Sequence, residues 1–104
     1  MDIRPNELPG EQGHALRVTI YSKPDCHLCE TLKADLLSMQ ASLSFTLRER
    51  NIEEDPDDFL RFRYLIPVLD IETGLIAANQ LLYPPHTWHS VYRALTAARK
   101  AMQG

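Results

Sequence analysis

Two kinds of apolar pattern run along the chain, and the first is alternation. Short segments in which apolar and polar residues alternate, with β-branched and aromatic side chains enriched, are typical of strands. Such segments lie at residues 17–22, 43–50, 67–71 and 75–80. In the first segment, Val18 and Ile20 should face one side of a sheet and Thr19 and Tyr21 the other. The last two segments flank Glu72-Thr73-Gly74, a turn composition that predicts an antiparallel hairpin.

The second pattern is the recurrence of apolar residues every three or four positions, which indicates helices. A first helix begins near Cys26, and its apolar face consists of Leu28, Leu32, Leu36, Met39 and Leu43. A second begins at Asp55, a capping residue followed by Pro56, and ends near Tyr64, because Pro67 cannot continue it. A third follows Pro84-Pro85, with an apolar face of Trp88, Val91, Leu95, Ala98 and Met102.

The predicted order of elements is β-α-β-α-β-β-α. This order favours an α/β fold with a four-stranded mixed sheet and helices on both faces, in which a right-handed helical crossover makes the first two strands parallel. We assign residues 16–104 to one domain. Residues 1–15 hold prolines and glycines among polar residues, and we expect them to form a mobile N-terminal tail.

Charge and hydropathy limit the partners and the compartment that can be expected for the protein. The formal net charge is −3 and the basic residues are scattered, which argues against a nucleic-acid partner. No apolar run approaches the roughly 18 residues of a membrane span, and residues 1–15 lack the apolar centre of a secretory signal. We therefore expect a cytoplasmic protein that acts as a monomer.

The chemistry of the chain is concentrated in Cys26-His27-Leu28-Cys29, which contains both of its cysteines. In a reducing compartment such a pair is more often catalytic or metal-binding than structural. At the start of a helix the Cys26 thiolate would be stabilised and nucleophilic, and Lys23 or a charged His27 would add to this. Cys29 lies one turn further on the same side, where it can attack a mixed disulfide.

Two segments resemble the glutaredoxins. Residues 20–29 (IYSKPDCHLC) are similar to the strand, Ser-Lys loop and C-x-x-C of that family, and residues 65–69 (LIPVL) are similar to its Thr-Val-Pro segment, whose proline is cis. The chain thus resembles a glutaredoxin-like protein of the thioredoxin-fold superfamily over roughly residues 16–102. The nearest family members would be small bacterial proteins with a Cys-His-Leu-Cys motif and a largely unassigned role.

The resemblance implies a thioredoxin-like fold and a thiol–disulfide oxidoreductase whose redox-active centre, Cys26 and Cys29, closes a disulfide. It implies a cis Pro67, with the backbone of Ile66 pairing with an extended substrate and Tyr64 lining the groove. The substrate would be a disulfide-containing protein or a small thiol compound. A reductase or glutathione would supply electrons, and no cofactor would be bound.

The chain departs from the family pattern at the glutathione site. Glutaredoxins open the last helix with Gly-Gly-x-Asp, whereas residues 82–87 here read LYPPHT. A Pro-Pro pair removes two backbone N–H donors that an anionic ligand would use. His27 and Leu28 also replace the usual Pro-Tyr between the cysteines, and Leu65 replaces the usual threonine. These departures argue against glutathione as a co-substrate.

Three alternative functions are compatible with the same residues. Cys26 and Cys29 could bind zinc together with His86 and His89. The chain could be a redox-inactive binding module that keeps the fold alone. An iron–sulfur cluster shared by two chains is a third alternative, but it would need the glutathione pocket that the sequence lacks.

Overall fold

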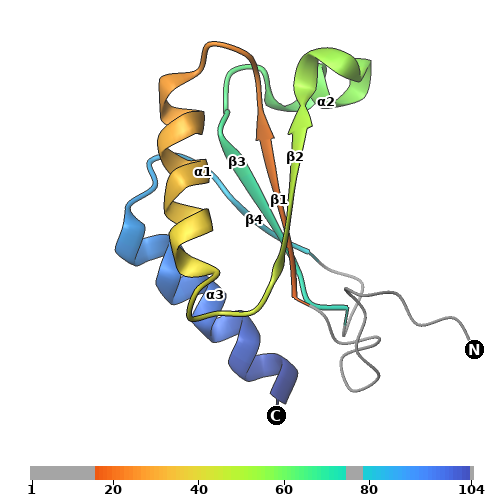
Figure 1. The fold of residues 1–104 in the computed structure, drawn as a ribbon. Coiled ribbons are helices and arrows are strands. Elements are labelled where there is room, and N and C mark those ends of the chain that lie inside the picture. The colour runs from red at the N-terminus through yellow and green to blue at the C-terminus, as the bar shows by residue number, and fades with distance from the viewer. Residues whose placement is uncertain (1–15, 75–78, 104) are drawn as a thin grey trace, which may run out of the picture.

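The computed structural model describes residues 16–74 and 79–103. A four-stranded sheet has the order β2-β1-β3-β4, in which β1 pairs parallel with β2 and antiparallel with β3, and β3 pairs antiparallel with β4. The strands are β1 (Arg17–Ser22), β2 (Thr46–Asn51), β3 (Val68–Glu72) and β4 (Gln80–Leu82). The helices are α1 (His27–Met39), α2 (Pro56–Phe62) and α3 (Trp88–Gln103), with a 3-10 turn, η2 (Ile52–Glu54), before α2. The predicted mixed sheet and element order are confirmed (Figure 1).

The alternation in β1 sends side chains into two separate apolar clusters. Val18 and Ile20 lie in the main core, to which α1 and α3 contribute from one face of the sheet. Tyr21 points to the opposite face and packs with Ile52, Phe62 and Val68. The helices therefore cover both faces, and Figure 1 shows α2 at the same end of the sheet as the loop between β1 and α1.

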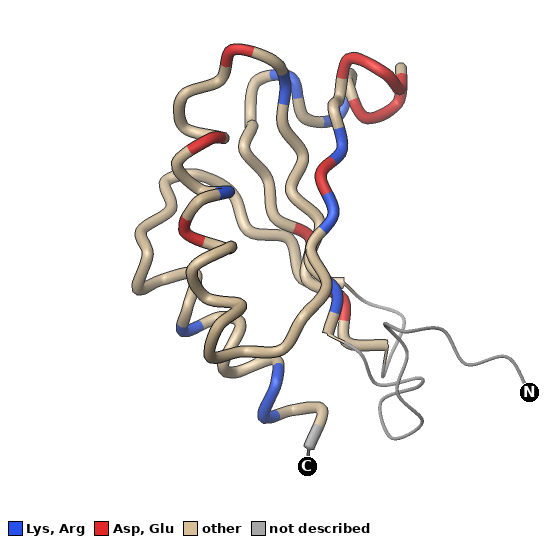
Figure 2. The backbone as a smooth tube through the Cα atoms, in the orientation of Figure 1, with Lys and Arg blue, Asp and Glu red and all other residues tan. Residues whose placement is uncertain are grey.

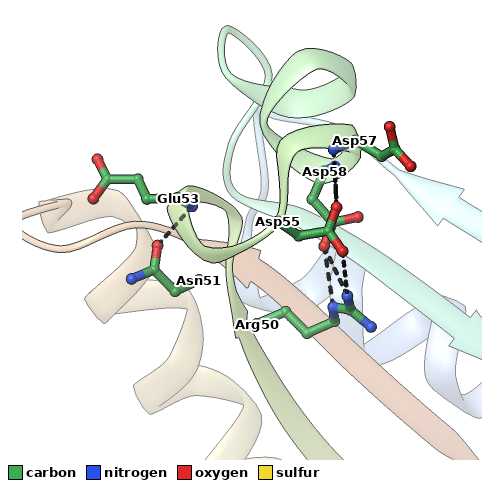
Figure 3. Close-up of polar contacts among 6 residues, drawn as sticks. All are labelled: Arg50, Asn51, Glu53, Asp55, Asp57 and Asp58. Atoms are coloured by element: carbon green, nitrogen blue, oxygen red, sulfur yellow. Dashed lines mark hydrogen bonds and ion pairs between the residues drawn. The ribbon is translucent and has the colours of Figure 1, made fainter.

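Helix α2 begins where an aspartate caps it, as the sequence predicts. The Asp55 carboxylate accepts hydrogen bonds from the backbone N–H groups of Asp57 (2.9 Å) and Asp58 (3.2 Å). Arg50, near the end of β2, donates from Nε to Oδ2 of Asp58 (3.1 Å), and its Nη2 forms ion pairs with Asp58 (3.0 Å) and Asp55 (3.5 Å) (Figure 3). This network ties the start of α2 to β2.

Two predicted strands have different limits in the structure. The second begins at Thr46 rather than at residue 43, although Leu43 and Phe45 still pack against the main core from the connecting segment. The fourth, predicted to end at residue 80, continues to Leu82, because Gln80–Leu82 pair with Leu69–Ile71. Residues 75–78 lie outside the described residues, as does the predicted mobile tail at residues 1–15.

Leu28 does not belong to the buried face of α1, contrary to the sequence prediction. Its side chain is 64% exposed, and the buried stripe runs through Cys29, Leu32, Leu36 and Met39. The first turn of α1 follows a loop beyond the end of β1, so its outward positions have no strand to pack against. The positive φ predicted at Gly74 is confirmed, with a value of 78° that glycine adopts without a steric penalty.

Candidate redox site

Cys26 and Cys29 form a disulfide at the N-terminal end of α1. Cys26 is the N-cap residue, and its Sγ accepts a hydrogen bond from the backbone N–H of Cys29 at 3.1 Å. Asp25 has a φ of 60°, and this left-handed residue turns the chain from the loop into the helix. Cys26 is half-buried whereas Cys29 is only 1% exposed. The two sulfur atoms therefore differ sharply in their access to solvent.

The N-terminal end of α1 provides positive charge next to Cys26. A helix of 13 residues presents unpaired N–H groups and a partial positive charge at its start. Lys23 and His27 both lie within three residues of Cys26, with exposed side chains. Within residues 16–74 and 79–103, neither side chain forms a hydrogen bond or an ion pair. The helix end is thus the fixed electrostatic feature of the site.

A polar chain connects the loop to β2. Ser22, at the end of β1 and almost fully buried, donates from Oγ to Oε2 of Glu49 (3.0 Å). Lys33 of α1 donates from Nζ to Oε1 of the same carboxylate (2.9 Å). These hydrogen bonds, chiefly that of Lys33, hold the pKa of Glu49 below its ordinary value. These hydrogen bonds link β1, α1 and β2 to one another, starting at the end of β1 from which the cysteine loop leaves.

The Ile66–Pro67 peptide bond is cis, and Pro67 is buried. The backbone N–H of Ile66 donates to the carbonyl of Phe62 at 3.1 Å, as part of the turn that ends α2. The N–H group of Ile66, whose backbone is expected to pair with a substrate strand, is therefore already occupied. Its carbonyl is the group left for such a contact.

Tyr64, which is expected to line the substrate groove, contacts Arg63 rather than the cysteine loop. Its side chain is 84% exposed, and the guanidinium of Arg63 lies over its ring at 4.7 Å. Among the described residues, no hydrogen bond or ring contact joins it to Cys26, Cys29 or Pro67.

The structure does not support the zinc alternative. His86 Nε2 lies 2.8 Å from the carbonyl oxygen of Pro67, and because a carbonyl only accepts, this nitrogen carries a hydrogen. His89 packs edge-on against Trp88, with ring centroids 5.5 Å apart. Within the described ranges, no three residues of the types His, Cys, Asp and Glu are grouped to hold a metal ion.

A cavity of about 350 Å³ lies beside the cysteine motif. It is lined on one side by α1 and on the other by Pro67 and the segment between β4 and α3. The lining residues are Leu28, Thr31, Leu32, Asp35, Pro67, Pro84, Pro85 and His86. Its volume lies in the range of small-molecule and side-chain pockets, about 300–1,000 Å³. Sequence reasoning missed this cavity, although Leu28, Thr31, Leu32 and Asp35 share the i, i+3, i+4, i+7 spacing of one helix face.

The comparison with known families agrees with this geometry. Residues 17–95 match the glutaredoxin-like domain family (DUF836). The chain belongs to this family. The matched range includes both cysteines of the glutaredoxin-like chain, Pro67 and the first half of α3. Among curated proteins there is no match.

Solved structures resemble the glutaredoxin-like chain in fold. The structural-genomics target protein XcR50 from X. campestris has 21% sequence identity and a TM-score of 0.62, with 77% of this chain and 96% of that chain covered. Thioredoxin 1 from Thermosipho africanus has 8% identity and a TM-score of 0.68, with coverages of 85% and 99%. Oxidized thioredoxin O2 from Arabidopsis thaliana has 12% identity and a TM-score of 0.65, with coverages of 82% and 76%. These likenesses show a thioredoxin-like fold.

Together, the family and the C-x-x-C pair at the start of α1 support a redox-type function. In the described part of the chain, no helix is long and apolar enough to cross a membrane.

Proposed function

We propose that the protein is a thiol–disulfide oxidoreductase in which Cys26 is the nucleophile and Cys29 the resolving thiol. The observation that carries this proposal is the contrast between the two sulfurs. Cys26 caps α1 and is partly open to solvent, while Cys29 is buried one turn behind it. A thiolate at the cap position is stabilised by the helix end and by the Cys29 N–H group, and only the thiolate attacks a disulfide.

The reaction starts from the reduced dithiol. The Cys26 thiolate attacks one sulfur of the substrate disulfide, so that a Cys26–substrate bond forms and the other substrate sulfur leaves as a thiolate. Cys29 then loses its proton and attacks Cys26 Sγ, which releases the second substrate thiolate and closes the Cys26–Cys29 disulfide. Two electrons pass from the protein to the substrate, and the two released thiolates take up protons.

A dithiol donor is the electron source that the site favours. The segment that opens α3 contains Pro84 and Pro85, which offer no N–H groups to a glutathione carboxylate. The nearby His86 ring donates its Nε2 hydrogen to Pro67 instead. We therefore propose that a protein dithiol of a reductase, rather than glutathione, regenerates the reduced pair. We also propose that the protein acts as a monomer in the cytoplasm.

Reduction of a protein disulfide by wild type and two single variants tests the proposal. Cys26→Ser should abolish turnover, because the attacking sulfur is gone. Cys29→Ser, the matched control, should still attack once and accumulate a mixed disulfide with the substrate, visible by mass spectrometry. If Cys26→Ser turns over substrate as fast as wild type, the protein is not an oxidoreductase of this kind and the binding-module alternative gains support.

A further inference from the structure

The cavity beside the cysteine motif contains a carboxylate that has no partner in the described residues. Asp35 lines the cavity and is half-buried. Within residues 16–74 and 79–103, no hydrogen bond or ion pair engages its carboxylate. The nearby cation on the same helix, Lys33, is already paired with Glu49 at 2.9 Å. The Asp35 carboxylate is therefore available to a ligand.

The rest of the cavity is apolar and carries no opposing charge. Leu28, Leu32 and three prolines form most of its lining, and the only other polar side chains are those of Thr31 and His86. The far wall belongs to a segment, residues 79–92, that contains no Asp, Glu, Lys or Arg. Figure 2 shows this stretch between β4 and α3 without blue or red. A ligand thus meets an apolar surface with one negative charge on its rim.

One end of the cavity is formed by a residue of the cysteine motif itself. Leu28 and Pro67 line it, and Leu28 stands between the two cysteines in the sequence. Near the C-terminal end of α1, Ser38 Oγ accepts a hydrogen bond from Trp88 Nε1 at 3.1 Å, which ties the start of α3 to α1. A substrate side chain in the cavity would therefore lie between two walls that are tied to each other, and the adjacent substrate residue would face Cys26.

We propose that this cavity selects the disulfide substrate: it accepts an apolar side chain close to the substrate cysteine, and Asp35 pairs with an adjacent lysine or arginine. The proposal rests on the thiol–disulfide exchange proposed above and names the class of polypeptide that enters it. Apolar burial holds the side chain in the cavity, and the uncompensated carboxylate favours a cationic neighbour over an anionic one.

Single-turnover kinetics with short peptides provide the test. Each peptide carries one cysteine in a mixed disulfide with thionitrobenzoate, whose release is followed by absorbance. Four peptides place Leu or Ser beside the cysteine, each combined with Lys or Glu. Bis(2-hydroxyethyl) disulfide, which has no side chain for the cavity, serves as the reference substrate. The measured quantity is the rate constant with each peptide, divided by that with the reference.

Wild type should prefer the Leu-Lys peptide over the Leu-Glu peptide by about tenfold, the size expected for a charge-assisted hydrogen bond at a half-exposed position. Asp35→Asn, which keeps the shape of the side chain, should bring the Lys-over-Glu ratio close to one. Glu30→Gln removes an exposed carboxylate from the first turn of the same helix, outside the cavity, and should leave that ratio unchanged.

Three results would overturn the proposal. Wild type could treat the four peptides alike, or Asp35→Asn could keep the preference. Glu30→Gln could lower the ratio as much as Asp35→Asn, in which case the preference comes from the overall charge of the helix. In each case reaction with the reference disulfide would leave the oxidoreductase function standing. If wild type reacts with neither peptides nor reference, that function fails and the substrate proposal with it.

Discussion

The two single-thiol variants allow the charge state of Cys26 to be read from the pH dependence of its alkylation. Cys29→Ser leaves Cys26 as the only thiol and keeps the backbone N–H that donates to its sulfur. Cys26→Ser leaves only the buried Cys29. We expect the first variant to react with iodoacetamide in mildly acidic solution, where free cysteine hardly reacts, and the second to remain unreactive while folded.

The expected size of the effect follows from the cap geometry. A partly exposed helix end stabilises an adjacent anion by about 1 kcal/mol. The hydrogen bond from the Cys29 N–H group adds about 1 kcal/mol net. Lys23 and Asp25 are both exposed and opposite in charge, so their contributions roughly cancel. A total of about 2 kcal/mol shifts the thiol–thiolate equilibrium by roughly 30-fold.

The assay compares the alkylation rate at pH 6 with that at pH 9 in one protein, which cancels the intrinsic nucleophilicity of the sulfur. For free cysteine, with a pKa of about 8.5, the ratio of the two rates is roughly 1/240. The shift derived above raises it to about 1/12 for Cys26. A measured ratio near 1/240 would refute the reasoning, because the helix end would then have no effect on the sulfur. Faster labelling of Cys29 than of Cys26 would refute the assigned order of attack.

Three further predictions concern stability. Because the hydrogen bond from Lys33 holds the pKa of Glu49 below its ordinary 4.5, the stabilisation is present above that pH and lost as the pH falls through the lower folded value. Glu49→Gln should therefore unfold at lower urea concentration than wild type at pH 7, and the difference should shrink as the pH falls below 4.5. Burial raises the pKa of Asp70 above 3.8, and one of its oxygens is buried without a partner among the described residues, so the charged form destabilises the fold at neutral pH. Asp70→Asn should raise the melting temperature at pH 7, and the gain should shrink below pH 4; a constant gain would contradict this cause. Leu36→Ala removes a fully buried side chain and should cost about 2–5 kcal/mol in urea unfolding, so a loss under 1 kcal/mol would mean that the core closes over the gap.

Elements with local signals were predictable from the sequence. The alternation of Arg17–Ser22 gives β1, and the Asp55-Pro56 pair gives the start of α2, because in each case neighbouring residues carry the whole signal. The limits of β2 and β4 were not predictable in this way. A strand ends where its partner stops pairing with it, so β4 ends at Leu82, the residue that pairs with Leu69.

The same distinction between local and long-range signals applies to the candidate site. The cysteines and Pro67 could be named from the sequence because their spacing and neighbours are characteristic. The cavity could not, since it joins one face of α1 to a proline segment some fifty residues later in the chain. The hydrogen bond from His86 to Pro67 also depends on this meeting of distant segments. The bond from the Ile66 N–H group to Phe62 could not be predicted either, because it depends on how α2 ends.

The central position of β1 decides which part of the protein opens last. Its backbone is bonded to β2 on one edge and to β3 on the other, whereas β2 and β4 each have a single neighbour in the described sheet. Transient local unfolding begins at such outer strands and reaches a doubly bonded strand only with global unfolding. The loop that carries Cys26 leaves from the end of this strand. The strand end that holds the loop should therefore stay folded while the outer strands open transiently.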